Sequence, residues 1–267
     1  MWDPQVYQRY GDERSRPFYD LTARVASHTP ALIVDLGCGP GNLTVTLGQR
    51  WAQARIEGID SSPEMIDSAR ALPEAASGRV SFAVGDVRGW VPPADVDVVV
   101  SNAVLQWVPG HRDLVTGWAR ALRPEAWLAF QVPGNFEGAS HQLLRELAAS
   151  PEWAQTLGDA PRDRTAVWDP VDYAGDLLAA GCAVDAWETT YLHQLPVVAD
   201  APHPVLSWME GTALRPVRDN LTRRPDGDAL WEKFRQQLQS RLAVAYPAEH
   251  GMVFFPFRRI FVVAQKG

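Results

Sequence analysis

Cysteine is scarce in this chain, which has only Cys38 and Cys182 among its 267 residues. Two isolated cysteines provide neither a disulfide framework nor the ligand spacing of a metal site, so we expect a cytoplasmic protein without a bound metal. Apolar runs long enough for a membrane span are also missing, and the first residues, Met-Trp-Asp-Pro-Gln, lack the basic and apolar regions of a signal peptide. We therefore expect no membrane partner.

An excess of positive charge is missing too. The formal net charge is −7 and the isoelectric point is about 5.4. Such a balance disfavours nucleic acid and anionic lipid as partners. Hydrophobic residues make up 46% and charged residues 21% of the chain, as in an ordinary globular protein. The length accommodates one α/β domain with an elaboration; a monomer is compatible with the sequence, which does not indicate the oligomeric state.

The most informative stretch is 31–41, which joins an apolar segment to a glycine-rich loop. Residues 32–34 predict a strand that is buried on both faces, and a helix is expected over 42–51. Between them stand an acid and glycines at alternate positions: Asp35, Gly37, Gly39 and Gly41. Glycines allow a ligand to approach the backbone closely, and open α/β sheets bind ligands at such strand-to-helix loops.

The glycine spacing separates two kinds of site. A dinucleotide site requires the pattern G-x-G-x-x-G, whereas this chain has G-x-G-x-G and places Asn42 at the position of the third glycine. Considered alone, the loop is also compatible with a βα turn that binds nothing.

Further strands are expected at 54–59, 80–84, 96–100 and 127–132, with helices between them. This alternation predicts a doubly wound α/β sheet. Asp60 follows the second strand, about 20 residues after the glycines, where a carboxylate reaches ribose hydroxyls.

The second half of the chain has a different rhythm. Two helices, a strand near 184–195 and a last strand over 253–264 are expected, and the long interval between these strands carries amphipathic helices. We interpret that interval as a helical cap inserted between the last two strands. The expected organisation is an arm and helix over 1–30, a core over 31–195, a cap over 196–250 and the last core strand over 251–267.

The succession of Asp35 with the glycines, Asp60, Gly85-Asp86 and Ser101-Asn102-Ala103 resembles the class I S-adenosylmethionine-dependent methyltransferases. Other motifs are similar to the trans-aconitate 2-methyltransferase family over nearly the whole chain: Glu13-Arg14-Ser15-Arg16-Pro17, Gly58-Ile59-Asp60-Ser61-Ser62-Pro63, Leu105-Gln106-Trp107, Thr189-Thr190-Tyr191, His193-Gln194 and Leu214-Arg215-Pro216. Two positions depart from it: Gly134 replaces an expected aspartate, and Arg258 is an additional basic residue.

The resemblance implies a Rossmann-like seven-stranded methyltransferase sheet and transfer of a methyl group from S-adenosylmethionine to one carboxylate of trans-aconitate. It implies no catalytic side chain beyond those that position the reactants. The implied cofactor residues are Asp35, Gly37, Cys38, Gly39, Gly41, Asp60, Ser61, Met65, Asp86, Val87, Asn102 and Gln106. The implied substrate residues are Tyr10, Arg14, Arg16, Trp107, Asn135, Tyr191, His193, Trp208, Arg215 and Arg259, with Arg215 and Arg259 as a carboxylate clamp.

Several of these residues also have structural interpretations. Arg259 interrupts the apolar face of the last strand, so it either pairs with an internal acid or faces the substrate. His193 and Trp107 are also compatible with structural positions in the core. Among functions, another small-molecule or carrier-linked dicarboxylate methyltransferase and a non-catalytic S-adenosylmethionine-binding protein remain alternatives, whereas Asn42 disfavours a nicotinamide-dependent dehydrogenase.

Overall fold

The computed structural model describes residues 11–158, 160–161 and 164–267, and within these the side chains of all but residues 11–14 and 164. Tyr10 therefore lies outside the described residues. The chain divides into two compact units. Unit 1 contains residues 1–133, 167–188 and 259–267, and unit 2 contains residues 134–166 and 189–258. Each unit is described by itself, and the domain boundaries expected from the sequence stay a prediction.

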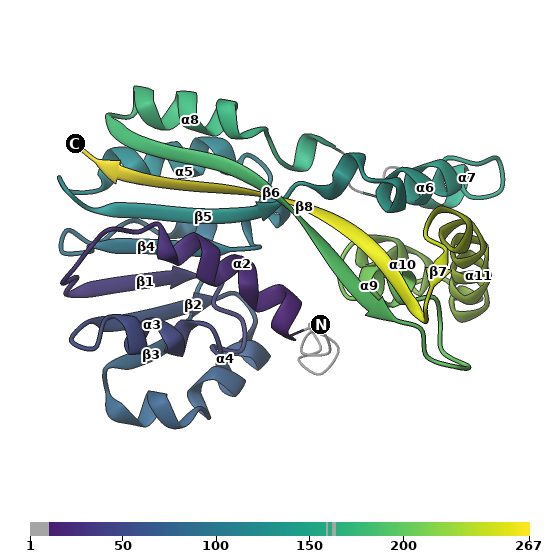
Figure 1. Ribbon diagram of the computed structural model, residues 1–267, viewed down its shortest axis with the longest axis horizontal. Helices are drawn as coiled ribbons and strands as arrows, with labels where there is room; N and C mark the ends of the chain where they lie inside the picture. The colour runs from purple at the N-terminus through teal and green to yellow at the C-terminus, as the bar shows by residue number, and fades with distance from the viewer. Residues whose placement is uncertain (1–10, 159, 162–163) are drawn as a thin grey trace. The chain divides into compact units, whose positions relative to one another are not determined.

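A mixed sheet organises the fold, with the strand order β3-β2-β1-β4-β5-β8-β6 and β7 paired to β8 (Figure 1). The strands are β1 (Leu32–Leu36), β2 (Arg55–Asp60), β3 (Val80–Val84), β4 (Val98–Asn102), β5 (Trp127–Pro133), β6 (Cys182–Pro196), β7 (Ala248–Glu249) and β8 (Met252–Lys266). The Rossmann-like sheet is confirmed. The sequence did not predict β7, because two residues carry no periodic signal.

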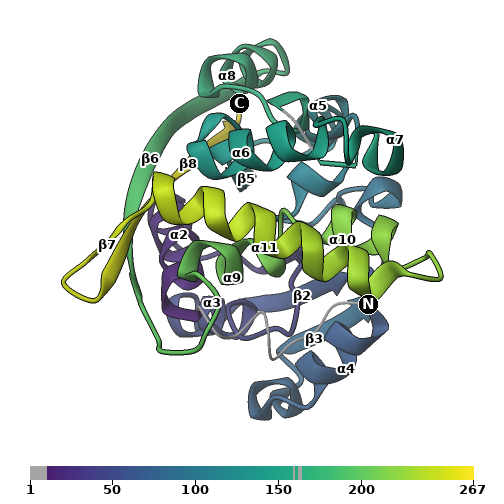
Figure 2. The ribbon, with the colours of Figure 1, turned by 90° about the vertical axis from the view of Figure 1, so that its right-hand side faces the viewer.

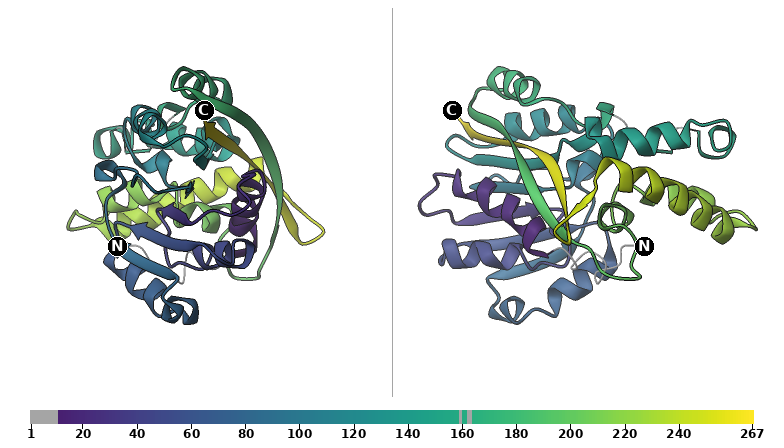
Figure 3. Two further views of the ribbon diagram at one scale, coloured as in Figure 1. Left: turned by 90° about the vertical axis from the view of Figure 1, so that its left-hand side faces the viewer. Right: turned by 45° about the vertical axis from the view of Figure 1, so that its right-hand side comes forward.

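The centre of the sheet is apolar on both faces, as the unbroken valine, isoleucine and leucine runs predict. β1 pairs in parallel with β2 and β4, and β4 pairs in parallel with β5. Every residue of β1 is buried, and so are the first four of β4. β8 then runs antiparallel to β5. Figure 3 shows β8, in yellow, beside the long green strand β6.

Unit 1 holds five α-helices among the described residues: α2 (Gly11–Ala23), α3 (Thr44–Arg50), α4 (Pro63–Arg70), α5 (His111–Ala121) and α8 (Pro170–Ala179). α4 begins as its sequence predicts: the Ser62 hydroxyl accepts a hydrogen bond from the Met65 amide at 3.3 Å, and Pro63 opens the helix. α2 covers Gly11–Ala23, within the arm and helix expected over 1–30, so Arg14 and Arg16 are helical. It packs against β4 and β5 (Figure 1).

Unit 2 is built around α11 (Gly227–Ala245), which packs against α6 (Ala139–Ala148), α9 (Pro204–Glu210) and α10 (Arg215–Leu221) (Figure 2). Its core residues Phe234, Leu238 and Leu242 are fully buried and four residues apart, on one face of the helix. The helices expected between the last two long strands are thus present. No helix in the described part of the chain is long and apolar enough to cross a membrane.

We predict that the hydrogen bonds and the ion pair of Asp97 contribute strongly to the unfolding free energy of the protein. Asp97 is buried just before β4, where its carboxylate accepts hydrogen bonds from the amides of Ala31 and Leu32 and pairs with Arg123. Asp97→Ala leaves these buried donors without an acceptor and should lower the unfolding free energy by about 2–4 kcal/mol in urea titrations. The control Asp95→Ala, at a side chain that is 69% exposed, should change it by less than about 0.5 kcal/mol. Equal effects would contradict this role.

Candidate active site

Two glycines in the loop after β1, Gly37 and Gly39, differ in the space around their backbone. Gly37 has φ +78°, and a Cβ there would lie 2.1 Å from Val104 Cγ2, so only glycine fits. The amides of Gly37 and Cys38 donate to the Ile59 carbonyl at 2.7 and 3.0 Å. At Gly39, with φ +54°, a Cβ would meet no described atom within 4 Å. The loop therefore leaves open space beside the backbone at Gly39, which is half-buried. Gly41 is packed against Phe82 and Ala69.

Asp60, at the end of β2, connects this loop to the start of α4. One carboxylate oxygen accepts the Gly39 amide at 2.9 Å, and the other accepts the Ser62 amide at 2.9 Å. Ser61 beside it is exposed and Met65 is buried. Because each carboxylate oxygen has two acceptor sites, Asp60 retains acceptor capacity for ligand hydroxyls.

Asp35, in the last part of β1, and Cys38, in the loop that follows, are both buried. Asp35 is 3% exposed and accepts the Thr44 hydroxyl at 2.6 Å. Burial, and to a lesser degree the charge of Asp60, raises the pKa of Asp35 to about 7. Burial and the same two carboxylates raise the pKa of Cys38 far above its usual value, so this thiol is unreactive.

Asp86 and Val87 follow β3 and differ in exposure. Asp86 is exposed and forms an ion pair and hydrogen bonds with Arg88, which lower its pKa to about 2. Val87 is buried. The pair thus offers a permanently ionised acceptor next to an apolar side chain.

Beyond β4 the backbone turns sharply. Ala103 has φ +59°, and its carbonyl accepts a hydrogen bond from the Gln106 side-chain amide at 2.6 Å. Trp107 is half-buried on the same short turn, residues 105–107. The Asn102 Oδ1 atom is buried and has no hydrogen-bond partner among the described residues. Because most buried polar atoms in native proteins are hydrogen-bonded, this oxygen is a candidate for contact with a ligand or a water.

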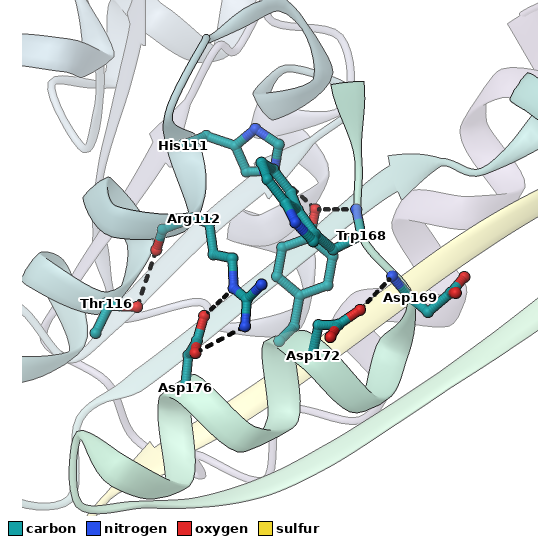
Figure 4. Close-up of polar contacts among 8 residues, drawn as sticks. His111, Arg112, Thr116, Trp168, Asp169, Asp172 and Asp176 are labelled. Atoms are coloured by element: carbon teal, nitrogen blue, oxygen red, sulfur yellow. Dashed lines mark hydrogen bonds and ion pairs between the residues drawn. The ribbon is translucent and has the colours of Figure 1, made fainter. Parts of the chain in front are cut away.

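A polar cluster that the sequence did not reveal fixes the segment after Trp107 (Figure 4). His111 Nδ1 lies 3.1 Å from the Val108 carbonyl, and because a carbonyl only accepts, Nδ1 carries the proton. Nε2 then accepts the Tyr173 hydroxyl at 2.7 Å, and that hydroxyl accepts the Trp168 amide at 3.3 Å. Burial lowers the pKa of His111. Arg112 pairs with Asp176 beside it and joins α5 to α8.

Arg259 is the most buried of the predicted substrate residues in unit 1. It is 5% exposed, and its Nη1 donates to the Gln131 Oε1 atom at 3.3 Å. The sequence periodicity did not indicate Gln131, although it is the one polar residue in the apolar segment of β5. Arg16 is exposed on α2, with Asp20 3.7 Å away. Arg14 lies in α2 but its side chain is not described.

The predicted substrate residues of unit 2 are a cluster of three rings and two further polar residues, Asn135 and Arg215. His193, Tyr191 and Trp208 are buried together: the His193 ring lies 4.6 Å from that of Trp208 and 6.2 Å from that of Tyr191. Asn135 is buried and accepts the Arg258 amide at 3.3 Å. Arg215 begins α10 and is half-buried, and desolvation lowers its pKa despite the opposing charge of Asp219. The substrate roles of all these residues stay predictions.

Known proteins resemble this chain over its full length. Residues 33–125 match a family described as methyltransferase domain. A trans-aconitate 2-methyltransferase from Mycobacterium sp. (strain KMS) is 54% identical over 100% of both chains. One from Rhodococcus jostii (strain RHA1) is 52% identical over 99% of both. The chain belongs to the trans-aconitate 2-methyltransferase family. The YcgJ protein from Bacillus subtilis shares the fold, with a TM-score of 0.59 at 14% identity over 94% of this chain and 98% of that one.

As a member of this family, the chain is an S-adenosylmethionine-dependent methyltransferase. The residues of unit 1 fit that cofactor. The open backbone at Gly39 gives room for the methionine portion, Asp60 has acceptor capacity for ribose hydroxyls, and the unsatisfied Asn102 oxygen suits a cationic or N–H donor.

The first prediction from this site concerns Asp60. Asp60→Ala removes the acceptor that holds Gly39 and that we predict to bind the ribose hydroxyls, so affinity for S-adenosylmethionine should fall by about 1.5–3 kcal/mol in calorimetry. The control Asp67→Ala, on an exposed position of α4, should leave the affinity unchanged. An unchanged affinity in a folded Asp60→Ala variant would remove Asp60 from the site.

The second concerns the raised pKa of Asp35. The folded protein holds a proton there up to about pH 7, whereas the unfolded chain releases it near pH 3.8, so this group reduces stability as the pH rises between these values. Asp35→Asn can keep the Thr44 hydrogen bond without the charge. Its unfolding free energy relative to wild type should therefore increase from pH 5 to pH 8 in urea titrations. A difference that does not vary with pH would show that Asp35 is not desolvated.

Proposed function

We propose that this chain transfers the methyl group of S-adenosylmethionine to a carboxylate oxygen of trans-aconitate, or of a closely related small tricarboxylate, giving a methyl ester. The observation that carries the proposal is Arg259, a guanidinium almost fully buried in the sheet of an acidic protein. A buried arginine suits bidentate recognition of a carboxylate. The names of the relatives at 54% and 52% identity support the same substrate.

The proposed reaction needs little from the protein besides positioning. A carboxylate is ionised at pH 7, so no side chain has to remove a proton. Bound S-adenosylmethionine supplies a methyl group on a sulfonium: the carboxylate oxygen–methyl bond forms while the sulfur–methyl bond breaks, and its electron pair returns to sulfur. Asp60 and the glycine loop hold one reactant and Arg259 holds the other. Orientation of this kind is worth up to roughly 7–11 kcal/mol.

Arg215 is proposed as a second carboxylate-binding residue. Its support is the desolvation of its guanidinium, which an anion would offset, together with the family-like motif Leu214-Arg215-Pro216. The leader residues and the aromatic cluster around His193 are proposed to assist. A cytoplasmic location, inferred from the cysteine content, also remains a proposal.

An acceptor screen with labelled S-adenosylmethionine tests the substrate. The purified chain is offered trans-aconitate, its cis isomer, a saturated tricarboxylate and a carrier-linked dicarboxylate, and methyl esters are identified by mass spectrometry. We expect ester formation with trans-aconitate above the others. Methylation of the carrier-linked acid alone would overturn the proposal in favour of the alternative methyltransferase.

Substitution of Arg259 tests its role. Arg259→Met should lower kcat/KM for trans-aconitate at least about 30-fold, because the carboxylate loses a buried cationic partner. Arg259→Lys should recover little, since an ammonium does not reproduce the two-pronged geometry. Affinity for S-adenosylmethionine should stay within about twofold of wild type.

Arg55→Met, at an exposed arginine on β2, is the matched control and should keep full activity. Arg215→Ala is measured in parallel. Near-normal kcat/KM in folded Arg259→Met would remove Arg259 from substrate binding.

A further inference from the structure

We propose that Gln131 is a second recognition residue for the acceptor carboxylate: its side-chain oxygen positions Arg259, and its NH2 group donates to the carboxylate that Arg259 binds. This rests on the proposed function, because it assumes a carboxylate acceptor at Arg259. The two residues belong to the same unit and are diagonal neighbours on the antiparallel strands β5 and β8, where Gln131 is opposite Phe261 and Arg259 is opposite Pro133.

The orientation of the Gln131 amide follows from its partner. A guanidinium has only donors, so the atom 3.3 Å from Arg259 Nη1 is the amide oxygen. The NH2 group is therefore not bonded to the arginine and is left to donate to another acceptor. Gln131 is 0% exposed, and its Nε2 atom has no hydrogen-bond partner among the described residues. A fully buried NH2 group without an acceptor is costly, and native proteins keep such groups where a ligand or an ordered water completes them.

The position of Gln131 favours a ligand. It is the register partner of Asn102 on the neighbouring parallel strand β4, so the two side chains lie on the same face of the sheet. Within the part of the chain that the structure describes, the buried Asn102 oxygen has no donor and the buried Gln131 NH2 group has no acceptor. An acceptor suited to the cationic cofactor and a donor suited to an anionic acceptor thus stand on adjacent strands. Methyl transfer requires its two reactants side by side in this way.

The proposed pair explains selectivity for an anion. A neutral amide NH2 and a guanidinium both donate, and two converging donors match the two oxygens of a carboxylate. A methyl ester has no charge, and its methylated oxygen is a weaker hydrogen-bond acceptor. The same two residues therefore bind the product less tightly than the substrate.

Two substitutions at this position separate positioning from recognition. Gln131→Glu is isosteric and retains an oxygen for Arg259, but it replaces the NH2 group with a second negative oxygen. Gln131→Met removes both functions without adding charge. If Gln131 donates to the carboxylate, the glutamate variant should be the worse of the two. If it only positions Arg259, the glutamate variant should match wild type and exceed the methionine variant.

The measurement is calorimetric binding of trans-aconitate in the presence of S-adenosylhomocysteine, with kcat and KM alongside. We expect the affinity to fall at least about 30-fold in Gln131→Glu and about 10-fold in Gln131→Met. Thermal unfolding and S-adenosylhomocysteine affinity verify the fold. Gln142→Glu adds the same charge at an exposed site on α6 and should leave trans-aconitate binding within about twofold of wild type.

The outcomes also separate this inference from the proposed function. Wild-type affinity in Gln131→Glu, or in Gln131→Met, overturns the recognition role even if the ester is formed. If the wild-type protein binds trans-aconitate but does not methylate it, and the variants rank as expected, the role of Gln131 is supported and only the proposed reaction is overturned. If the wild-type protein does not bind trans-aconitate, the role of Gln131 and the proposed function are both overturned.

Discussion

The carboxylate of Asp60 is the contact on which the arrangement of the loop after β1 depends. By accepting the Gly39 and Ser62 amides, it joins the loop after β1 to the start of α4. The Ile59 carbonyl reinforces the junction by accepting the two preceding loop amides. The charge of Asp60 also helps raise the pKa of Asp35. One side chain thus sets both the shape and the electrostatics of the loop, because backbone donors and a buried neighbouring acid converge on it.

The strands of the sheet carry buried polar side chains at the positions where cofactor or substrate binding is proposed. Asn102, Gln131 and Arg259 are polar residues in strands that otherwise bury valine, isoleucine, leucine and phenylalanine. Such exceptions reduce stability unless partners or ligands compensate, and they mark functional positions in many folds. An acidic protein that binds a polyanion also has to provide its cations locally, and a buried arginine held by an amide meets that requirement.

The core of unit 2 is apolar. Its helices bury one face of α11, which carries Phe234, Leu238 and Leu242, and a cluster of aromatic rings. His193 lies among Tyr191, Trp208 and Phe257, and Phe255 extends the same packing. An imidazole in such surroundings contributes apolar contact in addition to its polar atoms. The structural and the substrate interpretations of His193 are therefore compatible, because a buried ring can pack on one side and present a nitrogen on another.

The sequence by itself determined the strands of the parallel sheet, the Ser62 cap of α4, the glycine loop and the helices between the last two long strands, because each follows from local periodicity, caps or turn residues. The motifs also indicated the family and its cofactor. Only the tertiary structure decided how long-range polar partners combine. The pairing of Arg112 with Asp176, the His111–Tyr173 hydrogen bond and the amide of Gln131 against Arg259 join residues that are far apart in the chain. Periodicity specifies which face of a strand or helix is buried, whereas the partner across that face depends on how the elements pack.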